Sequence, residues 1–403
     1  MAELTLPPRL RDRMPGLDFV GRENSGVWVS AAASLIYLGL RLLSVVLITL
    51  LLKVGRFRSM HYPGGALHWM TEVADANHFR PIALYGYYHG TVRIPKTGYA
   101  FFPGYPMVIR TVARLPWVGL GPAGLIVTFG AGILAAWGLA SIGLRLTNSP
   151  KTSLLLVALW AAAPGALALD LMYSDALFCA LAIWSLYALL NQRWLTAGVL
   201  ALLAGTVRNT AVALVAALGV AALVEIVTAI RERRPLRPLW RPVVAPLIGS
   251  LGVAGYSTYV AVKIHHPSGW FWVERYQYNM YFDAGASTLR AVWTALTEDP
   301  QVRLVMVVAV ILAAVVLAAW CLTEQIPLAL KVYTALVVFM AITGNVHYVG
   351  GTPRFLLPSV LLGFPLARLL TRVRPVVLYP LITILGAVAA WYGLFLLSTN
   401  YAP

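Results

Sequence analysis

Residues 194–230 read WLTAGVLALLAGTVRNTAVALVAALGVAALVEIVTAI, an apolar run that is interrupted at Arg208. As one straight helix this run would extend about 55 Å, at about 1.5 Å per residue. The hydrocarbon core of a bilayer is only about 30 Å thick. We therefore predict two membrane-spanning helices, 194–207 and 209–230, that meet near Arg208.

The composition of the whole chain agrees with this interpretation. Of the 403 residues, 60% are hydrophobic and 11% are charged, whereas soluble domains carry roughly 45–50% and about 25%. The mean hydropathy is +0.76. So little polar surface excludes a soluble enzyme, a fibrous protein and a disordered chain. We predict an all-α polytopic membrane protein in which residues 1–403 form a single integral membrane domain.

Runs that could each form a span, which needs roughly 20 apolar residues, occur about eleven times. The fourth, fifth and tenth runs are short. The predicted spans are 27–52, 121–146, 151–170, 174–191, 194–207, 209–230, 242–263, 303–322, 326–343, 355–371 and 375–398.

The net charge of +16 is explained by topology, since Lys and Arg mark cytoplasmic loops and contact lipid headgroups. We expect membrane lipids as partners and no nucleic acid. Arginines are frequent in the tail 1–26, in 231–241 and in 368–374, and eleven spans place all three in the cytoplasm. Lys53, Arg56, Arg58, Lys263 and Arg303 deviate from this rule. High Ala and Arg usage indicates a bacterium, so the expected location is its plasma membrane.

This topology leaves two long loops outside, 53–120 and 264–302, both rich in Trp, Tyr, His and Pro. Loops of this length are seldom passive connections, and chemistry concentrates in loops. We therefore expect the active site on the outer face, with short interfacial helices in both loops.

Asp75 is the main candidate in the first loop. Leu67, Met70, Val73 and Ala74 recur at helical spacing and predict an interfacial helix that holds Asp75 near the membrane surface. A carboxylate there can act as a general base. The structural alternative is that Asp75 caps a helix beginning at Ala76.

Three further segments carry charge at the membrane boundary. In the turn Asp170–Asp175, Ser174 or Asp175 is either a helix cap or the partner of a cation or a ligand. Arg208, like Arg41 in the first span, has either a function or a carboxylate partner within the bundle, which for Arg208 is Asp175.

Arg354 opens the span at 355–371. Its guanidinium suits bidentate phosphate binding, or it extends to lipid headgroups.

The second outer loop continues with His265-His266, then Trp270-Phe271-Trp272 and Glu274-Arg275-Tyr276. Adjacent histidines point apart on a regular element, so they form a poor chelating pair, and we expect no metal site. The aromatic residues predict an interfacial belt, a sugar-stacking surface or a lipid-holding surface. No Walker motif or nucleophile elbow is present. Both cysteines, Cys179 and Cys321, lie in apolar runs as packing residues.

Taken in order, these motifs resemble one family over about residues 70–370. They are Asp75 followed by Phe79, Ile82-Ala83 and Gly86-Tyr87, then Phe101-Phe102-Pro103-Gly104-Tyr105-Pro106, Tyr173-Ser174-Asp175, Gly205 to Arg208, and Pro353-Arg354-Phe355. The chain resembles the PIG-V-type mannosyltransferases, GPI mannosyltransferase 2 and its bacterial relatives, in the GT-C superfamily of glycosyltransferases. It departs from them in having Ala74 where the family has Trp, and Asp175 where the family has Glu.

The resemblance implies a GT-C-like bundle and a polyprenyl-phosphate-mannose donor, with a glycolipid or a protein as acceptor and no cofactor. Asp75 would be the general base of an inverting transfer, and Arg208 and Arg354 would bind the donor phosphate. Residues expected to bind or orient substrate are Asn77, His78, Tyr173, Asp175, His265, His266 and His347.

Two other functions stay open. A transporter or lipid flippase predicts inverted repeats or paired broken helices, and the sequence has one clear break, at Arg208. A non-catalytic membrane subunit of a cell-envelope assembly would not need Asp75.

Overall fold

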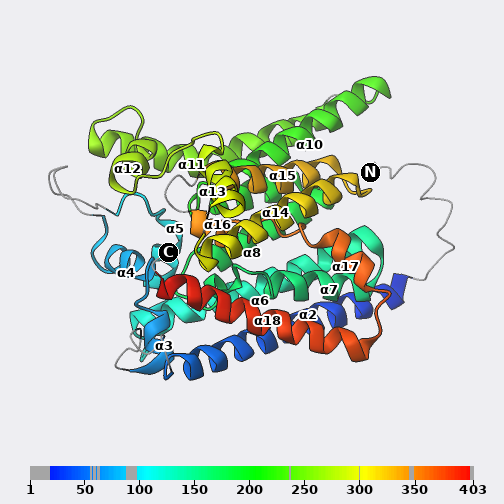
Figure 1. The fold of residues 1–403 in the computed structure, drawn as a ribbon. Coiled ribbons are helices and arrows are strands. Elements are labelled where there is room, and N and C mark those ends of the chain that lie inside the picture. Colours follow the sequence, from blue (N-terminus) through cyan, green and yellow to red (C-terminus); the bar gives the residue numbers. More distant parts are fainter. Residues whose placement is uncertain are drawn as a thin grey trace.

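The computed structural model describes residues 19–54, 57, 60, 64–87, 98–235, 237–298, 300–344 and 349–399. Every regular element within these ranges is a helix (Figure 1). The predicted all-α class is therefore confirmed.

Six helices are long and apolar enough to cross a membrane. They are α2 (Phe19–Leu51), α6 (Leu120–Thr147), α10 (Ala211–Arg231), α11 (Trp240–Ile264), α14 (Val302–Thr323) and α18 (Pro375–Ser398). Four shorter apolar helices accompany them: α7 (Pro150–Ala161), α8 (Asp175–Leu190), α9 (Trp194–Gly205) and α15 (Leu328–Thr343). The chain is a multi-pass integral membrane protein.

Two of the predicted spans are not continuous helices in the structure, and each is interrupted near a proline. The run 151–170 divides into α7 and the 3-10 helix η2 (Ala166–Leu169), separated at Pro164-Gly165. The run 355–371 is not one helix either. It follows the 3-10 helix η4 (Val349–Gly351) and the single turn α16 (Thr352–Phe355), and it contains turns around Pro358 before α17 (Phe364–Leu370). Proline lacks the backbone N–H that a continuing helix requires, and its ring clashes with the preceding turn.

The predicted break near Arg208 is present, since α9 ends at Gly205 and α10 begins at Ala211. Helix α9 packs closely on α11. A Cβ atom at Gly198 would lie 2.6 Å from the carbonyl oxygen of Ala245, and one at Gly205 would lie 2.8 Å from the amide nitrogen of Val253. Small residues allow this close approach of helices, which fixes where the turn with Arg208 emerges.

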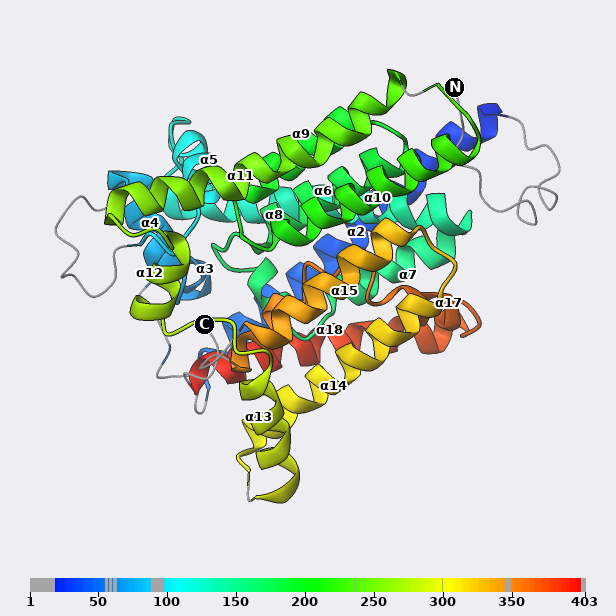
Figure 2. The same cartoon turned by 90° about the horizontal axis from the view of Figure 1, so that it is seen from above.

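Both long loops that the sequence predicts to lie outside contain short helices, as predicted. The first loop forms α3 (Gly65–Met70), α4 (Ala76–Tyr85) and α5 (Gly104–Val112), and the second forms α12 (Trp270–Gln277) and α13 (Ala286–Thr297). Helices α3, α4, α5 and α12 gather at one end of the bundle, whereas the start of α2, the end of α10 and α17 lie toward the other (Figures 1 and 2). The basic segment 231–241, which includes the 3-10 helix η3 (Arg237–Leu239), follows α10. Which end faces the cytoplasm stays a prediction.

Arg41 of α2 has a structural role. Its Nη1 donates to Asp170 Oδ2 at 2.8 Å and to the carbonyl oxygen of Ala166 at 2.7 Å, and its Nη2 donates to the carbonyl oxygen of Ala161. Ser44 Oγ also donates to Asp170 Oδ2, at 2.6 Å. The end of α7 leaves backbone carbonyls without helical partners, and this buried guanidinium satisfies that of Ala161. Its bond to Ala166 ties α2 to η2 as well.

We predict that Arg41→Met destabilises the protein by about 3–5 kcal/mol, because it leaves Asp170 buried without its cation. Thermal unfolding in detergent measures this loss. Arg41→Met/Asp170→Asn should recover part of it, and Leu42→Met, at a side chain that is 65% exposed on the same helix, should have little effect. Unfolding of Arg41→Met at the wild-type temperature would contradict the assignment.

Candidate active site

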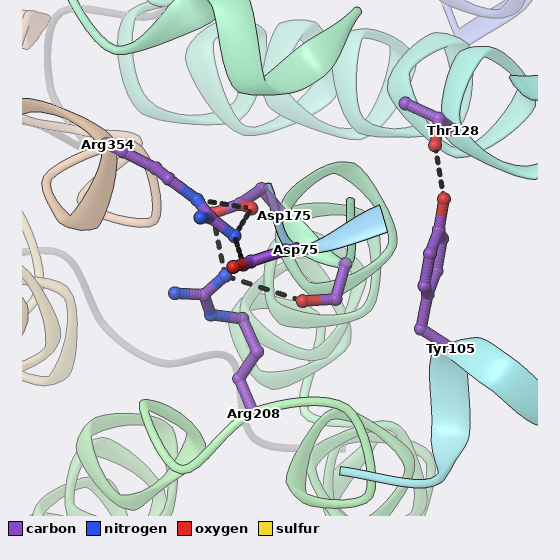
Figure 3. A network of polar contacts seen from close by, with 7 residues as sticks. Asp75, Tyr105, Thr128, Asp175, Arg208 and Arg354 are labelled. Atoms are coloured by element: carbon purple, nitrogen blue, oxygen red, sulfur yellow. Dashed lines mark hydrogen bonds and ion pairs between the residues drawn. The ribbon is translucent and has the colours of Figure 1, made fainter. Parts of the chain in front are cut away.

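Four charged side chains from distant segments meet at the end of the bundle near α4 and α12 (Figure 3). Asp75 directly precedes α4, and Asp175 is the first residue of α8. Arg208 lies in the turn between α9 and α10, and Arg354 lies in α16. The two carboxylates and two guanidinium groups balance in formal charge.

Arg354 joins both carboxylates. Its Nη2 lies 2.6 Å from Asp75 Oδ2 and 2.9 Å from Asp175 Oδ2, and its Nε donates to Asp175 Oδ2 at 3.0 Å. The guanidinium carbon is 4.1 Å from the centre of the Tyr173 ring, a cation–π contact. Arg354 is only 6% exposed, so the alternative that it extends to lipid headgroups is wrong.

Arg208 has the partner that the sequence suggested. Its Nη1 donates to Asp175 Oδ1 at 2.8 Å and lies 3.4 Å from Ser174 Oγ. Asp175 is fully buried, and the Arg208 side chain is 13% exposed. Its position on the cavity wall leaves part of this guanidinium accessible to a ligand.

The prediction of one interfacial helix that holds Asp75 is wrong in detail. Helix α3 ends at Met70, the chain turns through Ala74 in a left-handed conformation (φ 47°), and α4 begins at Ala76. Asp75 does occupy the N-cap position, but its side chain makes no capping hydrogen bond. The turn directs the Asp75 carboxylate to Arg354 instead. Ser174, at the N-cap position of α8, also makes no side-chain capping bond.

The motif Phe101–Pro106 supports the turn that carries Arg208. The amide nitrogen of Gly104 donates to the carbonyl oxygen of Thr206 at 2.7 Å. A Cβ atom at Gly104 would lie 2.6 Å from Thr206 Oγ1, so only glycine permits this approach. Tyr105 Oη is 2.7 Å from Thr128 Oγ1 (Figure 3), which anchors the motif to α6.

The charged cluster borders a cavity of about 840 Å³. Asp75, Arg208 and Arg354 all contribute to its wall. One part of the wall is aromatic and polar, from α4, α12 and the residues on either side of α12, and includes His78, His266, Trp272, Glu274, Tyr276 and Tyr278. Another part is apolar and includes Phe282, Val337, Phe339, Met340 and Phe355. This division would suit a ligand with a polar head and a hydrocarbon tail.

Of the other residues predicted to bind or orient substrate, the structure places some on the cavity wall and others away from it. His78 lines the cavity and stacks on Phe101 with ring centres 4.5 Å apart. His266 also lines it and packs against Trp272. Asn77 and His265 are exposed and lie outside the cavity wall, and Tyr173 is buried beneath Arg354. His347 lies outside the described residues.

Glu274 is a cavity residue whose importance the sequence did not reveal. Burial raises the pKa of its carboxyl to about 8, and the negative charge of Asp75 adds to this effect while Arg208 opposes it. The only sequence signal was a carboxylate among the aromatic residues of an outer loop. Around neutral pH Glu274 is therefore mostly an uncharged acid.

Over the ranges that the structure describes, no three His, Cys, Asp or Glu side chains are grouped as metal ligands. The absence of a metal and of a cofactor stays a prediction.

The sequence matches no protein-family model and no curated protein. Among solved structures, the chain is similar to ArnT from Cupriavidus metallidurans, a crystal structure with bound undecaprenyl phosphate. The sequences are 13% identical and the TM-score is 0.46, over 95% of this chain and 77% of that chain.

We predict that Asp175→Asn lowers the thermal stability more than Asp75→Asn does. Asp175 is fully buried and forms ion pairs with both Arg208 and Arg354. Asp75 is 17% exposed, and within the cluster it pairs with Arg354 only. Removing one partner of a buried ion pair leaves an uncompensated charge, which costs about 3–5 kcal/mol. Unfolding of both purified variants in the same detergent measures the order. Equal or reversed losses would contradict it.

Proposed function

We propose that the protein is a GT-C glycosyltransferase of the PIG-V type, which transfers mannose from polyprenyl-phosphate-mannose to a hydroxyl group of a lipid or protein on the outer face of the membrane. The observation that carries this proposal is that Asp75, Arg208 and Arg354 lie on the wall of one cavity, with the buried Asp175 paired to both arginines. The order of motifs in the sequence supports the same family.

The two arginines are the proposed ligands of the donor phosphate. A guanidinium group can bind phosphate through two parallel hydrogen bonds. Both guanidinium groups reach the cavity wall while Asp175 holds them from behind. Helix α10, which begins three residues after Arg208, directs its N-terminal end toward this region and adds a favourable dipole for an anion. The apolar wall formed by α15 would accept the first isoprenoid units.

Asp75 is the proposed base. A hydroxyl oxygen of the acceptor attacks the anomeric carbon, the bond from that carbon to the phosphate oxygen breaks, and the bonding electron pair stays with the phosphate. The hydroxyl proton passes to the Asp75 carboxylate. Arg208 and Arg354 stabilise the charge that develops on the leaving phosphate, so no strong acid is required. A single displacement of this kind inverts the anomeric centre, as one-step glycosidases do.

For this mechanism, a phosphate bound at Arg354 would compete with Asp75 for the same Nη2 group. We propose that donor binding weakens the contact between Asp75 and Arg354, and so makes Asp75 a better proton acceptor. The charge of the donor would in this way prepare the base before the acceptor reacts.

A lipid flippase is the second candidate, and the broken helices α9–α10 and α16–α17 favour it, because transporters place such breaks at their binding sites. A flippase would use the arginines to bind the lipid phosphate but would form no new glycosidic bond. The two functions therefore differ in whether Asp75 is needed for a chemical product.

We predict that Asp75→Asn lowers mannosyl transfer about 10²–10⁴-fold, the usual contribution of a general base. Membranes that contain either protein are given labelled polyprenyl-phosphate-mannose and cell-envelope lipids, and the labelled product is measured. Glu232→Gln, at an exposed residue in the predicted cytoplasmic linker, is the control and should transfer normally.

Undiminished transfer by Asp75→Asn would overturn the assignment of the base. Donor translocation by the wild type without any transfer to an acceptor would instead favour the flippase.

A further inference from the structure

Glu274 lies in α12 and contributes to the cavity wall. Its side chain is partly buried. Among the described residues, its carboxyl forms no hydrogen bond or ion pair with a protein group, although Asp75 and Arg208 lie close enough to act on it electrostatically. A carboxyl on a cavity wall that is not paired within the protein can bind a ligand directly. Its carboxyl therefore faces the space that a ligand would occupy.

Burial raises the pKa of the Glu274 carboxyl to about 8, with a smaller contribution from the Asp75 carboxylate, while Arg208 acts in the opposite direction. Titratable and charged side chains reach the same cavity from several elements. They are Asp75 before α4, His78 on α4, Arg208 before α10, His266 before α12, Arg275 and Tyr276 on α12, Tyr278 and Tyr281 after α12, and Arg354 on α16.

An uncharged carboxyl group both donates and accepts hydrogen bonds. A hydroxyl group has the same dual capacity, so the two are complementary. Tyr278 follows Glu274 by four residues, the spacing that places two side chains on the same side of a helix. Its ring is centred 5.8 Å from that of Phe101, and both residues line the cavity. Hydroxyl groups on a ring with apolar faces, as in a pyranose, would match this combination of a neutral acid and aromatic rings.

We propose that Glu274 binds hydroxyl groups of the acceptor and holds them beside Asp75, so that α12 forms the acceptor subsite for a hydroxyl-rich, sugar-like molecule. This inference rests on the proposed transferase function. It makes Glu274 a hydrogen-bonding residue rather than a second base, and it assigns the aromatic wall to the acceptor and the apolar wall to the donor lipid.

Replacement by glutamine separates these roles, because a glutamine side chain also donates and accepts hydrogen bonds but cannot take up the proton. In the transfer assay, Glu274→Gln should keep the KM for the acceptor within about twofold of the wild type near pH 7. Glu274→Ala should raise that KM about tenfold, the scale of one lost hydrogen bond to a buried group. The KM for the donor should be unchanged in both. Glu298→Gln, at an exposed residue after α13, is the matched control.

The pH dependence gives a second comparison. Between pH 7 and pH 9 the uncharged fraction of a group with a pKa of about 8 falls roughly tenfold. The wild type should lose acceptor affinity over this interval, and Glu274→Gln should not. Other groups in the cavity titrate in both proteins, so the difference between them isolates Glu274. Loss of transfer in Glu274→Gln as severe as in Glu274→Ala, or no effect of Glu274→Ala, would overturn the proposal.

A binding measurement tests the subsite without turnover. Infrared difference spectra of wild type against Glu274→Gln should show the C=O band of one uncharged carboxyl, and added methyl α-mannoside should shift that band. If the carboxyl band shifts but the protein transfers no sugar, the proposed subsite stands and only the proposed transferase function is contradicted. An unshifted band in a protein that does transfer mannose would contradict the subsite and leave the transferase intact.

Discussion

The ion pairs of Arg354 with Asp75 and Asp175 impose the constraint on which the site depends. Charged groups are costly inside a largely apolar bundle unless they are paired. Asp175 is fully buried between Arg354 and Arg208, so the starts of α4, α8 and α10 and the short helix α16 must converge. The breaks at α9–α10 and α16–α17 follow from the same requirement, because irregular backbone delivers side chains that a continuous span would hold elsewhere.

This convergence gives the cavity two walls of different chemistry. The apolar wall from α15 and the aromatic, polar wall from α12 line the same cavity as Arg208 and Arg354. The motif around Gly104 keeps the turn with Arg208 in place through its bond to Thr206. Proposed donor and acceptor groups would thus meet beside one carboxylate, as a single displacement requires.

Much of this could be predicted from the sequence, because apolar length and isolated charges are local signals. The run 194–230 predicted the helix break, and a pairing of Arg208 with Asp175 was one of the two interpretations left open for that arginine. The contact between Asp75 and Arg354 joins residues far apart in the chain, which periodicity cannot reveal. The prediction of one helix leading to Asp75 failed because Ala74 adopts a left-handed turn, a conformation that its residue type does not indicate. Glu274 was missed because its pKa depends on burial and on Asp75, both set by tertiary structure.

The central claim is that Arg208 and Arg354 bind a lipid phosphate beside Asp75. An experimental structure of the protein with a bound polyprenyl phosphate tests it most directly. The account predicts phosphate oxygens within hydrogen-bonding distance of both guanidinium groups, isoprenoid units along the apolar wall from α15, and a lengthened contact between Asp75 and Arg354. A phosphate bound away from both arginines, with the contact between Asp75 and Arg354 unchanged, would contradict it.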